Sequence, residues 1–91
     1  MMYSIKVTSK FKKDYKRLKK RGYNLQLLHD LIELLAAGKQ LDAQHNDHQL
    51  QGKMKDFREC HITSDWLLIY RIDNNIMVLC LMETGTHADL F

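Results

Sequence analysis

The alternation of hydrophobic and polar positions in the last third of the chain predicts three consecutive strands, around which the rest of the fold is arranged. Residues 57–62, 65–72 and 76–83 are rich in β-branched, aliphatic and aromatic side chains, and short polar segments separate them. Asn74 and Asn75 lie between the last two runs, and asparagine tolerates the positive φ that a two-residue hairpin turn demands. We therefore expect an antiparallel meander of three strands.

Turn length also predicts which residues of the meander lie opposite one another. A two-residue loop in the second hairpin places Trp66 opposite Glu83 and Asp65 opposite Thr84. These four residues then share one end of the sheet.

The first hairpin brings a histidine to the same end. A loop at 63–64 places His61 opposite Trp66, and a three-residue loop shifts this pairing by one position. In both cases His61, Asp65 and the exit of the last strand gather at one end of the sheet. His87 follows that strand closely and starts from the same end. This cluster is the candidate site.

The N-terminal residues predict a strand followed by a basic helix. Residues 3–7 alternate weakly and form a short strand, and Thr8 or Ser9 can cap a helix that runs to about Arg21 and stops at Gly22. Its apolar residues recur at helical spacing and give a single narrow buried stripe: Phe11, Tyr15 and Leu18.

A second helix follows after a short connection. Asn24 can cap a helix from Leu25 to about Ala37, which Gly38 closes. The inner face of this helix is strongly apolar, so it must pack against a sheet or another helix. The order strand, helical hairpin and three-stranded antiparallel meander predicts an α+β fold, in which the two helices pack on one sheet, and a single domain over residues 1–91.

The segment 39–55 between the helices and the meander is polar and is expected to be an unstructured connection. A connection of this length in so small a domain is usually functional. His48 lies eight residues before Asp56, where the first strand of the meander is expected to begin. Eight residues span up to about 27 Å, so His48 can reach the candidate site.

The charge of the chain is concentrated in its first quarter. Residues 1–24 hold nine of the 14 lysines and arginines and one acid, Asp14, a balance of +8 against a net charge of +3 for the whole chain. Such a surface favours a polyanionic partner. No apolar run approaches the roughly 18 residues of a membrane span, and the N-terminus lacks a secretion signal. We expect a cytoplasmic protein without membrane contact, whose two cysteines, Cys60 and Cys80, stay free thiols.

Histidine and aspartate side chains at this sheet end suit acid–base cleavage of RNA. Such cleavage needs a base for the 2′-hydroxyl, an acid for the departing 5′-oxygen and positive charge beside the phosphorane-like transition state. Imidazoles titrate near neutral pH and can fill each role without a metal or another cofactor. A metal site is the competing interpretation, since His45-x-x-His48 has tolerable ligand spacing and His61 and Asp65 could complete it. No CxxC or HExxH motif supports that alternative.

Four stretches of the chain carry a family resemblance. They are Asp47-His48-Gln49-Leu50-Gln51-Gly52, Phe57-Arg58-Glu59-Cys60-His61-Ile62, Asp65-Trp66-Leu67-Leu68-Ile69-Tyr70 and Thr84-Gly85-Thr86-His87-Ala88-Asp89-Leu90-Phe91. In this order they resemble the YafQ-type toxins of the RelE/ParE superfamily, over the whole chain and including the basic first helix.

The resemblance implies the toxin of a type II toxin–antitoxin system with a RelE-like fold. It implies a ribosome-dependent mRNA endonuclease that cuts A-site codons and arrests translation. It also implies a cognate antitoxin of the DinJ/RelB type, through which alone the toxin would meet operator DNA.

The same resemblance assigns roles to residues. His87 is expected to be the general acid, Asp65 or His61 the general base, and His48 a group that stabilises the phosphate. The resemblance implies that Phe91 positions the RNA, and we expect Arg58, Trp66 and Arg71 to be substrate-positioning residues as well. The charge of the first helix gives a further expectation, because its basic residues form a dense positive surface with little acid among it. The residues expected to bind ribosomal RNA are Lys12, Lys13, Lys16, Arg17, Lys19 and Lys20.

Two positions depart from the family pattern. Gln49 stands where a proline commonly follows the first histidine, and Glu83 where an arginine frequently precedes the Thr-Gly-Thr/Ser-His motif. A carboxylate at 83 cannot neutralise a scissile phosphate. The alternatives are a ParE-like toxin that acts on DNA gyrase without nuclease activity, and a small RNA-binding regulatory domain.

Overall fold

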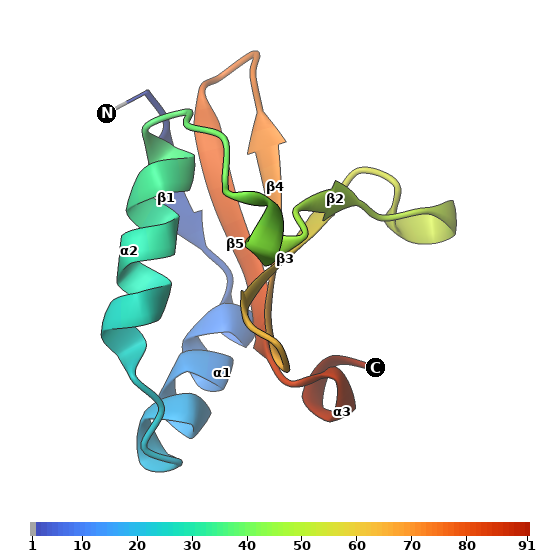
Figure 1. Cartoon of the computed structure of the whole chain (residues 1–91). Coiled ribbons are helices and arrows are strands. Elements are labelled where there is room, and N and C mark those ends of the chain that lie inside the picture. The colour runs from blue at the N-terminus through green and yellow to red at the C-terminus, as the bar shows by residue number, and fades with distance from the viewer. Residues whose placement is uncertain (1) are drawn as a thin grey trace.

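The computed structural model describes residues 2–91, which form one sheet with two long helices and a short C-terminal helix (Figure 1). The elements in chain order are β1 (Ser4–Val7), α1 (Ser9–Lys20), α2 (Leu25–Ala36), the 3₁₀ turn η1 (Ala43–His45), β2 (His48–Gln49), the 3₁₀ turn η2 (Gly52–Met54), β3 (Arg58–Thr63), β4 (Trp66–Asp73), β5 (Val78–Gly85) and α3 (His87–Leu90). No helix within residues 2–91 has the length and apolar character needed to cross a membrane.

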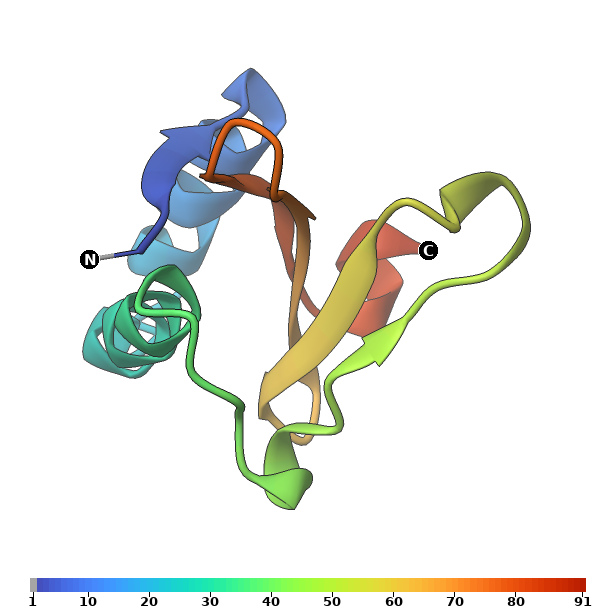
Figure 2. The ribbon, with the colours of Figure 1, turned by 90° about the horizontal axis from the view of Figure 1, so that it is seen from above.

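The five strands have the spatial order β1-β5-β4-β3-β2. β1 runs parallel to β5, while β5, β4, β3 and β2 pair antiparallel in turn. Figure 2 shows α1 and α2 on one side of the sheet and α3 on the other. The predicted α+β class, helical hairpin and meander are confirmed. The sequence did not predict the extra strand β2.

Side-chain caps start both long helices where the sequence predicted them. The Thr8 hydroxyl accepts the Phe11 amide at 3.0 Å, and the Asn24 side chain accepts the Gln26 amide at 3.2 Å. The chain leaves α1 through Gly22, at a φ of 82° that glycine adopts without strain. Each helix ends one residue before the predicted position.

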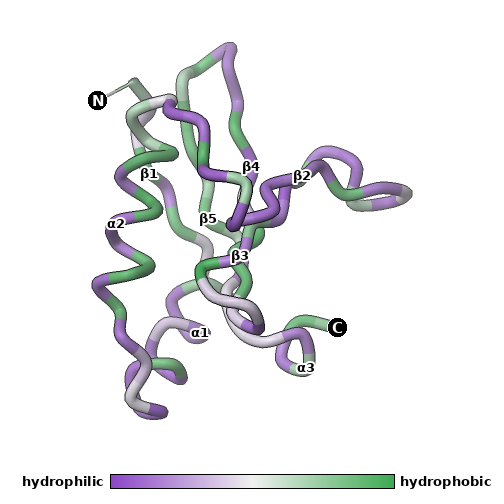
Figure 3. Tube along the Cα trace, viewed as in Figure 1, coloured by the Kyte–Doolittle hydropathy of each residue, from purple (hydrophilic) through white to green (hydrophobic). Residues whose placement is uncertain are grey.

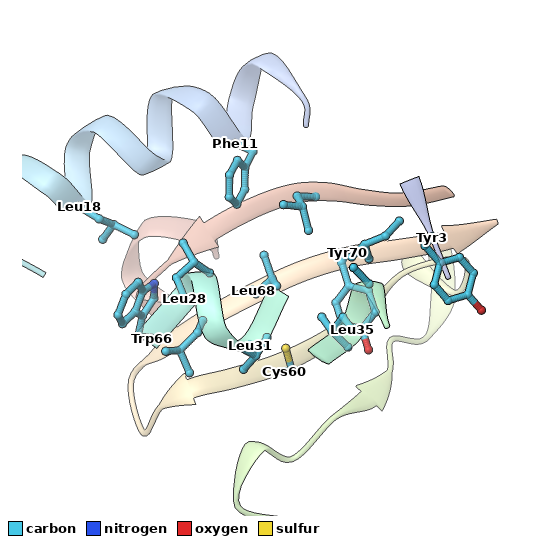
Figure 4. Close-up of a cluster of buried hydrophobic side chains, with 14 residues drawn as sticks. Tyr3, Phe11, Leu18, Leu28, Leu31, Leu35, Cys60, Trp66, Leu68 and Tyr70 are labelled. Carbon is cyan, nitrogen blue, oxygen red and sulfur yellow. The ribbon is translucent and has the colours of Figure 1, made fainter. Parts of the chain in front are cut away.

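The core lies between the two long helices and the sheet (Figure 4). Leu18 of α1 and Leu28 of α2 are fully buried, and so are Leu68 and Leu79 of the two central strands. Tyr23, just before α2, packs edge-on against Trp66 with ring centroids 5.0 Å apart. The buried face of the sheet is thereby committed to packing, so chemistry must take place on the other face or at an end.

The second hairpin has a longer turn than the sequence predicted. Residues 74–77 form the turn, Asp73 pairs with Val78, and the Asp73 carboxylate accepts the Asn75 amide at 3.0 Å. The turn has two extra residues, and the register shifts between Ile69 and Tyr70. Every residue of β4 therefore has a different partner on β5 from the predicted one.

The predicted pairs of Trp66 with Glu83 and of Asp65 with Thr84 are therefore wrong. Glu83 lies opposite Ile69, and Thr84 lies opposite Leu68.

In the first hairpin Ser64 and Asp65 form the turn, and Trp66 pairs with Thr63 instead of His61. A bulge between His61 and Thr63 then pairs His61 with Leu67. Leu67 of β4 also pairs with Gly85 of β5, so His61 and the end of β5 lie on either side of Leu67. The expected gathering at this sheet end survives the change of register.

The polar segment before the meander is mostly hydrophilic but is not an unstructured connection (Figure 3). It holds η1, β2 and η2, and β3 begins at Arg58, two residues later than expected. Asp47 accepts hydrogen bonds from the Tyr70 hydroxyl at 2.6 Å and from Arg58 Nε at 3.3 Å, which fix the segment against the sheet. Burial, and then the hydrogen bond to Asp47, raise the pKa of the Tyr70 hydroxyl.

Candidate active site

The candidate site begins with the alternation of side chains along β3. Cys60 and Ile62 point into the core, and burial raises the pKa of the Cys60 thiol. Glu59 and His61 therefore lie on the opposite face of the strand. Both cysteines are free thiols, as expected.

His48 joins this face through the short strand β2, where it pairs with Glu59. Its Nδ1 lies 2.7 Å from the carbonyl oxygen of Asn46. Because a carbonyl only accepts, Nδ1 carries the hydrogen. The other ring nitrogen, Nε2, then faces Glu59 Oε1 at 3.6 Å.

His61 approaches the same carboxylate from the neighbouring position. Its Nδ1–H donates to the Ser64 carbonyl at 3.3 Å, and its Nε2 lies 3.8 Å from Glu59 Oε1. Glu59 is only 6% exposed. Two imidazoles thus share one nearly buried carboxylate, and a proton on either Nε2 would create an ion pair.

His87, the first residue of α3, completes the group. Its Nδ1 lies 3.5 Å from Asp65 Oδ1, and its ring centroid is 6.0 Å from that of His61. The Phe91 ring lies 6.1 Å from the ring of His87 and is exposed. The side chains of His87 and Asp65 are 55% and 71% exposed, so a large ligand can reach them.

Three predicted side chains lie elsewhere. Trp66 is 2% exposed in the core and donates its Nε1–H to the Thr84 hydroxyl at 2.9 Å. Arg58 is on the core-facing side with Tyr70 and Asp47. Arg71 is on the same sheet face as Ile69 but farther along β4, 3.9 Å from Asp73.

His45 is also committed elsewhere, because its Nδ1 lies 2.6 Å from the His61 carbonyl oxygen and the ring donates there. Within residues 2–91 no three side chains of His, Cys, Asp or Glu gather in a group suited to hold a metal ion.

The basic surface of α1 is exposed at five of the six predicted positions, namely Lys12, Lys13, Lys16, Lys19 and Lys20. The sixth, Arg17, donates to Asp14 at 2.9 Å. Asp14 is fully buried, also pairs with Lys10, and accepts the Thr84 amide at 3.1 Å. Lys10 also lies 3.7 Å from Glu83, the residue that departs from the family pattern, so this carboxylate has a cation beside it.

Sequence reasoning missed two carboxylates that organise this region. Glu59 is two residues before His61 on a strand, a spacing that places both on one face. That signal was present in the sequence. Asp14 is the one acid among the basic residues of α1, and nothing local indicates that it is buried.

Comparison with known proteins gives the class. The family described as "Bacterial toxin of type II toxin-antitoxin system, YafQ" matches residues 3–91. The mRNA interferase toxin YafQ of Escherichia coli K12 is 38% identical over 88 residues, covering 96% of this chain and 94% of that protein.

Solved structures agree in sequence and in fold. A metal-bound toxin from Helicobacter pylori superimposes with a TM-score of 0.93 at 42% identity, covering 99% of this chain and 100% of that one. The YafQ chain of the E. coli DinJ-YafQ complex has a TM-score of 0.90 at 37% identity, with 98% of each chain covered.

Fold and comparisons together define a class, the bacterial toxins of type II toxin–antitoxin systems. Within that class the chain belongs to the YafQ family.

Proposed function

We propose that this toxin is an endoribonuclease that cleaves mRNA at codons in the ribosomal A site and so arrests translation. The observation that carries the proposal is the convergence of His48, His61 and His87 with Glu59 and Asp65 at one end of the sheet. The name of the E. coli relative, an mRNA interferase, supports the same activity.

The proposed reaction uses the acid and base groups of the chain itself. A base, Asp65 or His61, takes the proton of the 2′-hydroxyl, and the 2′-oxygen attacks the adjacent phosphorus. The bond from phosphorus to the 5′-oxygen breaks, leaving a 2′,3′-cyclic phosphate on one fragment. His87 gives its proton to the departing 5′-oxygen, which becomes a free hydroxyl.

The spacing of the groups fits this assignment. The attacking and leaving oxygens lie on opposite sides of the phosphorus, so acid and base must stand a few ångströms apart. The ring centroids of His61 and His87 are 6.0 Å apart. A protonated His48, held by Asn46 and facing Glu59, would supply positive charge to the transition state. Phe91, beside His87, offers a ring on which a base can stack.

The partners follow from charge and from the relatives. The exposed lysines of α1 suit the phosphate backbone of ribosomal RNA. A DinJ-like antitoxin is the proposed cognate partner, because the E. coli relative is seen in a complex with DinJ. Contact with operator DNA would come through that antitoxin. We propose the cytoplasm as the compartment, since the ribosome is the target.

The test is single-turnover cleavage of ribosome-bound mRNA by the parent and by His87→Gln, with 5′ ends mapped. We expect in-frame cuts at A-site codons for the parent and a rate loss of about 10²- to 10⁴-fold for the variant. The parent rate should fall as rising pH removes the His87 proton, and the variant should lose that dependence. His29→Gln on α2 is the matched control, because His29 bonds to Tyr15 away from the site.

Three results would contradict the proposal. A His87→Gln rate within threefold of the parent would remove His87 from the chemistry. Intact ribosome-bound mRNA, with altered DNA supercoiling in cells, would favour a gyrase-directed toxin, and binding of RNA without cleavage would favour a regulatory domain.

A further inference from the structure

The helix that carries His87 is short and depends on outside support. α3 spans four residues, and an isolated helix of that length is not stable in water. A capping box closes its start, in which the Thr86 side chain accepts the Asp89 amide and the Asp89 carboxylate accepts the Thr86 amide. This box shapes the turn but does not join it to the rest of the domain.

Arg21 supplies a link from the far end of α1. Its Nη1 and Nη2 donate to the two carboxylate oxygens of Asp89 at 2.8 and 3.1 Å, a two-point contact between residues 68 positions apart. The Arg21 guanidinium, and after it the Thr86 amide, hold the pKa of the Asp89 carboxyl well below its usual range. The Asp89 carboxylate thus takes part both in the capping box with Thr86 and in the contact with Arg21.

Gly85 leaves room for this arrangement. A β-carbon at position 85 would lie 2.9 Å from both Cβ and Oδ2 of Asp89. Any larger residue would therefore have to displace the carboxylate that Arg21 holds.

The link is the last of a series along α1. The Thr8 hydroxyl donates to the Met82 carbonyl at 2.7 Å, and Asp14 accepts the Thr84 amide at 3.1 Å. With Arg21 bound to Asp89, successive positions from the N-cap of α1 to its C-cap hold successive positions of the segment that ends in α3. These three contacts fix the direction in which the segment from Met82 to Asp89 runs and its position against α1.

We propose that Arg21 is a positioning residue, which through Asp89 holds α3 so that the His87 imidazole stays against Asp65 and His61. The catalytic consequence rests on the proposed function, while the positioning itself does not. A competing interpretation makes Arg21 one more phosphate-binding cation of the basic helix. In the structure its two terminal nitrogens are both engaged by Asp89, which favours positioning.

The first measurement needs no ribosome. Hydrogen exchange of the Leu90 and Phe91 amides, which bond to the Thr86 and His87 carbonyls, should be at least threefold faster in Arg21→Gln than in the parent. Arg21→Lys, which restores the charge without the two-point contact, should lie between them. Lys39→Gln, an exposed position on another segment, loses the same charge and should match the parent.

The pH dependence of this difference has a definite sign. A carboxylate with a lowered folded-state pKa contributes stability above its unfolded-state value of about 3.9, and loses it as pH falls through the folded-state value. The exchange difference between parent and Arg21→Gln should therefore be full at pH 6 and disappear once acid protonates Asp89.

The second measurement is the single-turnover cleavage rate at saturating ribosome concentration. Displacement of a reacting group by about 1 Å can cost up to 10²-fold, so we expect Arg21→Gln to be 10- to 100-fold slower, with Arg21→Lys partly restored. Both variants should show only a small drop in melting temperature, because the contact between Arg21 and Asp89 is exposed. Unchanged amide exchange in Arg21→Gln would overturn the proposal, and so would a loss confined to ribosome affinity. A parent without cleavage activity would refute the proposed function, and the exchange result would still decide the role of Arg21.

Discussion

Replacement of the buried carboxylate Asp14 by alanine should destabilise the whole domain. Asp14 is 0% exposed and accepts the buried Thr84 amide. Leaving a buried donor without a partner costs about 1–3 kcal/mol. The side chains of its cations, Lys10 and Arg17, are 47% and 37% exposed, so each screened ion pair adds only about 0–1 kcal/mol. We expect a total loss of about 2–4 kcal/mol.

Thermal and urea melts of purified variants measure this loss. For a domain of this size 1 kcal/mol corresponds to about 4–8 °C, so Asp14→Ala should melt roughly 8–32 °C below the parent. Asp14→Asn keeps an acceptor for the Thr84 amide and should lose about half as much. Asp30→Ala is the control, because Asp30 is exposed on α2 and accepts a hydrogen bond from Gln26, which is also exposed. If alanine and asparagine cost the same, or alanine costs less than about 1 kcal/mol, the hydrogen bond to Thr84 is not the source of stability.

Two further predictions concern charge near the RNA. Glu83→Arg should raise the single-turnover cleavage rate and Glu83→Gln should raise it less, because a carboxylate opposes the anionic transition state. Lys10, 3.7 Å from Glu83, offsets the charge of that carboxylate only in part. If both variants are slower, Glu83 has a positive role instead. The second variant changes four exposed lysines of α1 to glutamine, namely Lys12, Lys13, Lys16 and Lys19. It should reduce the slope of log ribosome affinity against log salt by about 3, with little change in melting temperature. An unchanged affinity at low salt would refute this prediction.

The sequence was sufficient to predict the elements whose signals are local. Thr8 and Asn24 cap their helices as expected, because a side-chain acceptor at a helix start acts within three residues. The gathering of His61, Asp65 and His87 also followed from strand order alone, since a meander returns alternate strand ends to one side.

Features that depend on distant contacts were not predictable in the same way. The predicted register of the second hairpin was wrong because the positive φ of its turn, expected at asparagine, is found at Met77, where φ is 54°. β2 is two residues long and forms only against β3, so it has no periodicity of its own. Asp14 is buried because a backbone amide 70 positions away needs an acceptor, which no local pattern reveals.

The place of β5 between β1 and β4 has a consequence for how the protein comes into being. During synthesis the ribosome delivers β1, α1, α2, β3 and β4 before the strand that unites them. Until β5 is made, β1 has no neighbour in the sheet and Asp14 has no Thr84 amide to accept. His87 follows still later. A growing chain therefore cannot bring together the histidines of the proposed site until the final strand has been translated.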